Sequence, residues 1–143
     1  MQTLHPVSTK RIACAPRRET ILVVDEEKIV RDVACAILSK GGYDVMQAES
    51  VQAALEIARN NPREISLVVL DPNVRDVNAR RTFTELLATR PELALVLCSG
   101  YPPSDTVQSF GASRVSDFVQ KPYTSSRLRS AVESALMPHA FAA

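Results

Sequence analysis

Short apolar runs alternate along the chain with longer stretches in which apolar residues recur every three or four positions. Continuous β-branched runs are typical of strands buried on both faces, and the longer spacing is typical of amphipathic helices. The predicted strands are centred on residues 21–24, 43–48, 67–70, 93–98 and 118–119. The predicted helices follow them at about residues 29–38, 51–58, 83–87, 105–110 and 128–136. The helix expected from Asp105 to Phe110 is short and has the weakest pattern.

Boundary residues support these elements. Ser50 is a plausible N-cap for the second helix, and the pair Gly41-Gly42 ends the first. Prolines at positions 62, 91 and 138 close three further helices, because proline lacks the amide that a helix interior needs. Five strand–helix pairs with strands buried on both faces predict an α/β fold with a doubly wound parallel sheet.

Composition restricts the classes of function. The chain has 143 residues, enough for one domain, with 17 Lys and Arg against 16 Asp and Glu. This balance gives no general argument for nucleic-acid binding, and no apolar run is long enough to cross a membrane. Three cysteines, Cys14, Cys35 and Cys98, lack the spacing of a disulfide scaffold or a zinc site. We therefore expect a cytoplasmic protein without nucleic-acid or membrane partners.

The ends of the chain differ from its middle. Residues 1–18 contain four basic residues, two prolines and no acidic residue, and they lack the apolar core of a secretory signal. We expect a flexible basic tail over 1–18, one domain over 19–138 and a short tail over 139–143. Because so few residues follow the last predicted helix, we expect no fused output domain.

Polar residues end the predicted strands. Asp25 and Glu26 follow the first strand, Asp71 the third, Ser99 the fourth and Lys121 the fifth. In doubly wound sheets the ligand site lies beyond the carboxyl ends of the strands, so these groups should converge. Neighbouring carboxylates repel one another unless a cation compensates them, and Mg²⁺ prefers oxygen ligands. A lysine and a hydroxyl beside such a centre suit phosphoryl transfer.

These motifs resemble the receiver domain of two-component response regulators over about residues 20–137. The resemblance is carried by residues 21–27 (ILVVDEE), 67–71 (LVVLD), 98–101 (CSGY) and 118–123 (FVQKPY). The amino-acid sequences of the last two motifs are most similar to those of receivers at the ends of hybrid sensor kinases. The resemblance implies a flavodoxin-like five-stranded sheet with strand order 2-1-3-4-5.

The resemblance also implies roles for single residues. Asp71 would be the phosphoacceptor, and Asp25, Glu26, Asp71 and the backbone carbonyl of Asn73 would hold Mg²⁺. Lys121 would contact the phosphoryl oxygens, and its bond to Pro122 is a candidate cis peptide.

Two further residues would act in switching. Ser99 would be the hydroxyl that moves toward the phosphoryl group, and Phe118 the aromatic side chain that swings inward with it. The phosphoryl donor would be a histidine kinase or a histidine phosphotransfer protein. A downstream protein would bind the face made by the fourth helix, fifth strand and fifth helix, at about residues 105–137.

The sequence departs from the family pattern just after Asp71. Pro72 has no N–H to donate to a phosphoryl group, so we expect the acyl phosphate to form or persist poorly. Val74 and Arg75 replace the usual Met-Pro pair, and Ala79 replaces a glycine. Glu26 in place of a second aspartate keeps the charge.

We interpret the chain as a phosphoacceptor receiver that catalyses only its own phosphorylation and dephosphorylation. One alternative is a degenerate receiver that binds proteins without being phosphorylated. Two classes of enzyme have a similar sheet, but the residues that they require differ from those of this sequence. A flavodoxin-like cofactor site requires phosphate-binding loops where Asp25, Glu26 and Glu27 stand. A haloacid dehalogenase-type phosphotransferase requires a second aspartate where Asn73 stands.

Overall fold

The structure is a computed structural model that describes residues 18–61, 64–72, 77–101 and 114–137, with residues 77–80 described by their backbone alone. Several predictions lie outside these ranges. They concern the tails, the helix at 105–110, and Asn73, Val74 and Arg75; the side chain of Ala79 is likewise not described.

The described residues form one parallel sheet with the strand order β2-β1-β3-β4-β5. The strands are β1 (Thr20–Val24), β2 (Asp44–Ala48), β3 (Ile65–Leu70), β4 (Ala94–Ser99) and β5 (Asp117–Gln120). The helices are α2 (Lys28–Lys40), α3 (Val51–Asn60), α4 (Val77–Thr89) and α6 (Ser125–Leu136). The predicted doubly wound sheet and its strand order are confirmed.

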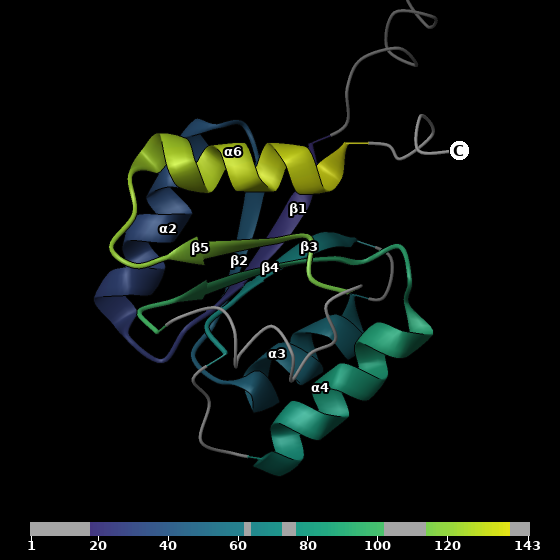
Figure 1. Cartoon of the computed structure of the whole chain (residues 1–143). Helices are drawn as coiled ribbons and strands as arrows, with labels where there is room; N and C mark the ends of the chain where they lie inside the picture. Colours follow the sequence, from purple (N-terminus) through teal and green to yellow (C-terminus); the bar gives the residue numbers. More distant parts are fainter. Residues whose placement is uncertain (1–17, 62–63, 73–76, 102–113, 138–143) are drawn as a thin grey trace, which may run out of the picture.

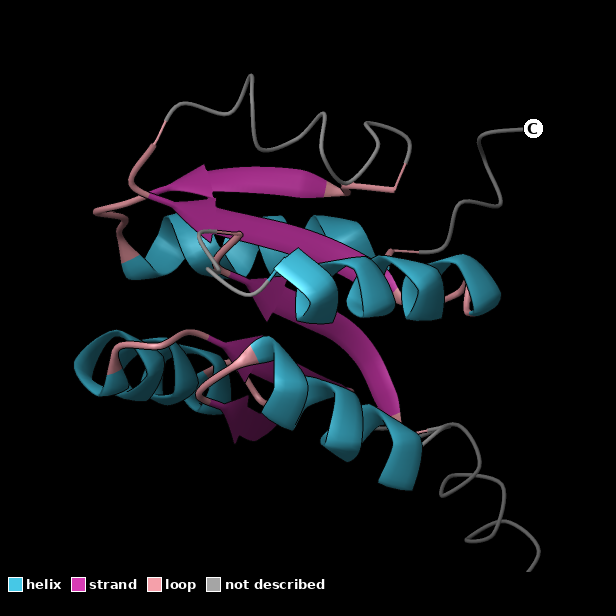
Figure 2. Cartoon of the chain, turned by 90° about the horizontal axis from the view of Figure 1, so that it is seen from below, coloured by secondary structure: helices cyan, strands magenta, loops and turns pink. Residues whose placement is uncertain are grey.

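Helices cover both faces of the sheet. Figure 1 shows α2 and α6 on one face and α3 and α4 on the other, and Figure 2 shows the strands between these two layers. Each face has its own apolar core. Leu22, Leu55 and Phe83 belong to the core under α3 and α4, and Ile21 and Leu128 belong to the core under α2 and α6. This two-sided burial explains why the central strands are almost continuously apolar.

Local signals fix the helix boundaries. The Ser50 hydroxyl accepts a hydrogen bond from the Ala53 amide at 3.0 Å, which confirms the predicted N-cap of α3. Thr124 caps α6 in the same way, through the Arg127 amide. After α2 the chain reverses at Gly42, whose φ of 97° is unfavourable for residues with a side chain.

Two apolar residues of α2 lie outside its buried face. Ile29 and Val33 share the helical spacing of the other apolar residues of α2, yet Ile29 is 78% exposed and Val33 is 49% exposed. The buried stripe of α2 consists of Ala34, Cys35 and Leu38. Ile29 and Val33 are one turn apart on a stripe rotated away from the sheet.

Within the described ranges, none of the helices combines the length and apolar character needed to cross a bilayer.

Candidate functional site

The carboxyl edge of the sheet gathers four of the predicted site residues. Asp25 follows β1, Asp71 follows β3, Ser99 ends β4, and Lys121 follows β5. The ladder places Asp71 beside the end of β1, because the Asp71 amide donates to the carbonyl of Val24, the residue before Asp25, at 3.0 Å. The strand ends therefore lie at one level, as the topology requires.

Lys121 brings two carboxylates together. Its Nζ lies 2.7 Å from Oδ2 of Asp25 and 2.8 Å from Oδ2 of Asp71. The side chains are 18%, 7% and 19% exposed, respectively. The positive charge of Lys121 offsets the electrostatic repulsion between the two largely buried carboxylates.

The ionisation of Lys121 follows from these contacts. Burial by itself disfavours the ammonium, but hydrogen bonds and charge attraction from Asp25 and Asp71 outweigh it and raise the pKa of Lys121 above its usual value. Lys121 therefore remains a cation throughout the neutral range, which is the state needed to contact an anionic group.

Asp25 is held on both of its oxygens. Oδ1 accepts a hydrogen bond from the Glu27 amide at 2.9 Å, and Oδ2 accepts the bond from Lys121. By contrast, the side chain of Glu26 is exposed. In the part of the chain that is described, no three His, Cys, Asp or Glu side chains form a group able to hold a metal ion.

The donor set nevertheless fits a hard cation. Lys121 shows that a positive charge is already accommodated between the carboxylates of Asp25 and Asp71. Carboxylate oxygens are the ligands that Mg²⁺ prefers, and Mg²⁺ commonly binds one or two carboxylates and keeps several waters. Glu26 follows Asp25 in sequence, and Asn73 lies outside the described residues.

Ser99 and Phe118 occupy the neighbouring strands. Ser99 is fully buried, and its Oγ accepts a hydrogen bond from the Tyr101 amide at 3.1 Å. Phe118 is partly buried and packs against the core under α3 and α4. The Lys121 amide donates to the Ser99 carbonyl at 2.8 Å, so the backbone of β5 fixes Lys121 beside Ser99. The predicted cis bond between Lys121 and Pro122 is confirmed.

Cys98 and Tyr123, near the site, have raised pKa values. Burial raises the pKa of the Cys98 thiol to about 12 and that of the Tyr123 hydroxyl to about 12. Both are therefore neutral at pH 7. Cys98 is a poor nucleophile in this state, because the thiolate is the reactive form. This agrees with a packing role for Cys98.

An apolar hollow of about 440 Å³ adjoins the site. Its lining residues come from α2 and from the loop after β5, and they are Ile29, Val30, Val33, Lys121, Pro122 and Tyr123. Sequence reasoning missed this surface because helical spacing does not distinguish the apolar residues of α2 that pack on the sheet from those that are exposed. The signal that could have revealed it is the offset of Ile29 and Val33 from the stripe of small residues further along the helix.

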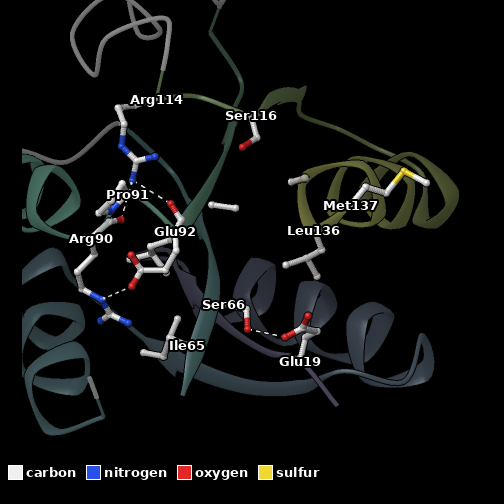
Figure 3. A pocket seen from close by; sticks show the side chains of 13 residues that line it. Glu19, Ile65, Ser66, Arg90, Pro91, Glu92, Arg114, Ser116, Leu136 and Met137 are labelled. Atoms are coloured by element: carbon white, nitrogen blue, oxygen red, sulfur yellow. Dashed lines mark hydrogen bonds and ion pairs between the residues drawn. The ribbon is translucent and has the colours of Figure 1, made fainter. Parts of the chain in front are cut away.

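A second hollow, of about 670 Å³, lies at the opposite edge, where the strands begin. Figure 3 shows Arg90 and Arg114 on one side of it and Glu19 and Ser66 on the other. Each of these groups makes a contact, although Nη1 of Arg90 and Nε of Arg114 are buried without a hydrogen-bond partner among the described residues. Arg114 donates to the carbonyl of Leu93 at 2.8 Å, Arg90 lies 3.8 Å from Glu92, and Ser66 donates to Glu19 at 2.6 Å. Their contacts stabilise the loops at this edge.

Comparisons with known proteins agree with this geometry. A profile of the response regulator receiver domain matches residues 21–133. The sensor kinase CckA of Brucella abortus is 29% identical over 117 residues, which are 82% of this chain and 12% of that protein. The chain spans only 12% to 32% of the first curated relatives it matches.

Solved structures give the same result. The receiver domain of NtrX from Brucella abortus is 35% identical with a TM-score of 0.68, covering 81% of this chain and 97% of that one. A receiver domain protein from Clostridium thermocellum has a TM-score of 0.73 at 23% identity, covering 82% and 94%, and shows the same fold.

Proposed function

The chain belongs to the response regulator receiver domain family of two-component systems, and on that premise we propose that Asp71 accepts a phosphoryl group from a phosphohistidine. The observation that carries the proposal is the contact of one ammonium, Lys121, with the carboxylates of both Asp25 and Asp71 at the carboxyl edge of the sheet. The donor is a histidine kinase or a histidine phosphotransfer protein.

The transfer is a displacement at phosphorus. A carboxylate oxygen of Asp71 forms the new P–O bond while the P–N bond of the phosphohistidine breaks. The electron pair of the P–N bond remains on the imidazole nitrogen, which takes up a proton. Lys121 stays protonated and contacts the phosphoryl oxygens, whose negative charge it neutralises.

Asp25 and Asp71 are the residues that would hold Mg²⁺, with Glu26 and the carbonyl of Asn73 as further ligands. When bound, the metal supplies positive charge to the phosphoryl oxygens. This chain's own part is to keep Asp25 oriented through the Glu27 amide and to keep Lys121 between the two aspartates.

Signalling would follow from rearrangement of the buried groups near the phosphoryl group. The Ser99 hydroxyl would exchange its bond with the Tyr101 amide for one with the phosphoryl group, and Phe118 would move inward beside it. The surface of β5 and α6, together with the preceding segment, would then be read by a downstream protein.

We assign docking of the phosphohistidine partner to the apolar hollow beside the site. Ile29 and Val33 lie one turn apart on α2 and are exposed, and the hollow that they line also includes Lys121. Exposed apolar side chains at the rim of a polar site are typical of protein contact surfaces. A partner helix with apolar side chains would bury them and bring its histidine toward Asp71.

Phosphorylation is tested by intact-mass spectrometry after incubation with Mg²⁺ and a small acyl-phosphate or phosphoramidate donor. We expect one phosphoryl adduct on the wild type and on a control variant, Asp32→Asn, which alters an exposed aspartate of α2. The adduct should be absent from Asp71→Asn and from a sample with chelator. An adduct that persists in Asp71→Asn would contradict the proposal. No adduct on any protein would favour a phosphorylation-independent binding module.

The docking surface is tested with the double variant Ile29→Ser, Val33→Ser. We expect slower phosphotransfer from a phosphorylated histidine kinase and unchanged phosphorylation by the small donor, which needs no docking. Met137→Ser, which removes an exposed apolar side chain at the opposite edge, is the matched control. Equal transfer rates for the double variant and the wild type would exclude this surface.

A further inference from the structure

Arg31 connects α2 to the acidic turn after β1. Its Nη1 donates to the carbonyl of Asp25 at 2.8 Å and lies 3.5 Å from the carbonyl of Glu26. Its Nε donates to Oε1 of Gln47, on β2, at 3.2 Å. One guanidinium therefore contacts two successive residues of the turn and the neighbouring strand.

Other contacts hold the side chain of Asp25 and the start of the turn. The Glu27 amide donates to Oδ1 of Asp25 at 2.9 Å, and Lys121 donates to Oδ2. Glu27 is the N-cap residue of α2, but its side chain makes no capping hydrogen bond. The Asp25 amide bonds to the Ala48 carbonyl at 3.1 Å, which fixes the start of the turn on β2. Beyond that point the carbonyls of Asp25 and Glu26 are both directed to Arg31. Arg31 thus holds the backbone of Asp25 and Glu26 through hydrogen bonds to their carbonyl oxygens.

We infer that Arg31 is a positioning residue for the Mg²⁺ site. By fixing the peptide units of Asp25 and Glu26, it keeps the Asp25 carboxylate beside that of Asp71 and limits the positions that the exposed Glu26 carboxylate can reach. The inference rests on the proposed function, because it assigns Asp25 and Glu26 to the metal. Arg31 itself contacts backbone oxygens and does not touch the phosphoryl group.

The positive charge of Arg31 would weaken Mg²⁺ binding, whereas its positioning of the turn would strengthen it. A guanidinium near a cation site repels the cation, so its removal on electrostatic grounds alone would strengthen metal binding. Arg31 is partly exposed, and interactions between solvated charges change affinity by about fivefold or less. Loss of residues that orient metal ligands typically weakens binding by about 10- to 100-fold. Positioning should therefore outweigh repulsion, and the two effects predict changes of opposite sign.

The test is direct measurement of Mn²⁺ binding to the full chain by electron paramagnetic resonance, without any phosphoryl donor. Mn²⁺ replaces Mg²⁺ at carboxylate sites. Four variants are compared with the wild type. They are Arg31→Ala, Arg31→Lys, Gln47→Ala and the control Arg59→Ala, which alters an exposed arginine at the end of α3.

We expect Arg31→Ala to weaken Mn²⁺ binding by about 10-fold. Arg31→Lys should also weaken it although the charge is kept, because an ammonium lacks the planar fork that reaches the turn and Gln47 together. Gln47→Ala should have a smaller effect in the same direction, and Arg59→Ala none. Thermal unfolding in chelator, measured in parallel, separates an effect on the metal site from a general loss of stability.

Three results would overturn the inference. Tighter binding by Arg31→Ala with unchanged binding by Arg31→Lys would show that Arg31 acts only through its charge. Equal affinities in all variants would show that the turn needs no support from Arg31, and the proposed function would stand. If the wild type itself bound no Mn²⁺, the metal site would fail and the role of Arg31 with it.

Discussion

Lys121 links the carboxylates of Asp25 and Asp71. Its Nζ lies within 2.8 Å of both Asp25 and Asp71, in a largely buried setting. Replacing Lys121 with methionine should lower the free energy of unfolding by about 3 kcal/mol in chelator, because a buried ion pair that loses one partner leaves uncompensated charge. Excess Mg²⁺ should reduce this loss. Urea unfolding with and without Mg²⁺ measures both effects.

The matched control for that variant is Lys40→Met, at the exposed end of α2, which should change stability little. The raised pKa of Lys121 also determines how its contribution to the free energy of unfolding changes with pH. Because the pKa of Lys121 is raised in the folded state, its stabilising effect is fully present below the usual lysine value of about 10.4. It is lost only as the pH rises through the raised pKa. An equal loss of stability in Lys121→Met and Lys40→Met would contradict the shared-cation account.

Pro72 follows the proposed phosphoacceptor directly. It is buried directly after Asp71 and has no N–H to donate to a phosphoryl oxygen. Pro72→Ala restores that donor, so the acyl phosphate should form faster or last longer, by at most about 100-fold. Intact-mass time courses of formation and decay measure this. Unchanged formation and lifetime would show that the missing amide has no effect here.

Arg127 of α6 forms a bidentate ion pair with Asp117 of β5. Arg127 donates to Asp117 at 3.0 and 3.1 Å and to the Phe118 carbonyl at 2.9 Å. Burial alone would raise the pKa of Asp117, but hydrogen bonds from Arg127 and from the Phe118 amide outweigh it and lower the pKa. Because the folded-state pKa lies below the unfolded one, the contribution is present above about pH 3.9 and lost as pH falls through the lowered pKa.

Asp117→Asn should therefore reduce the free energy of unfolding by about 0.5 kcal/mol at pH 7, a small value because both side chains are partly exposed. The difference from the wild type should shrink as the pH falls below 4. Urea unfolding at pH 7, 4 and 3 measures it. A difference that stays constant over this range would exclude the ion pair as its cause.

At the scale of elements, hydrophobic periodicity predicted all five strands and the four helices of the described residues. It succeeded because each strand is buried on both faces and each helix packs one face on the sheet. Periodicity did not distinguish Ile29 and Val33, which are exposed, from Ala34, Cys35 and Leu38, which form the buried stripe of α2.

At the scale of the whole molecule, the site was predictable because parallel topology brings distant strand ends to one edge. Asp25, Asp71, Ser99 and Lys121 meet there although they are spread over 97 positions of the chain. Other features were not predictable from the sequence. The hydrogen bonds of Arg31 and the direction of the Glu26 side chain depend on turn geometry, for which residue types alone give no rule.

The claim that Asp71 is the phosphoacceptor is tested most directly by trapping the acyl phosphate chemically. Wild-type protein is incubated with Mg²⁺ and a small phosphoryl donor and then reduced with borohydride, which converts an aspartyl phosphate to homoserine. Peptide mass spectrometry then identifies the altered residue. Our account predicts homoserine at position 71 and at no other aspartate. Homoserine at a different position, or a phosphoryl adduct with position 71 unchanged, would contradict it.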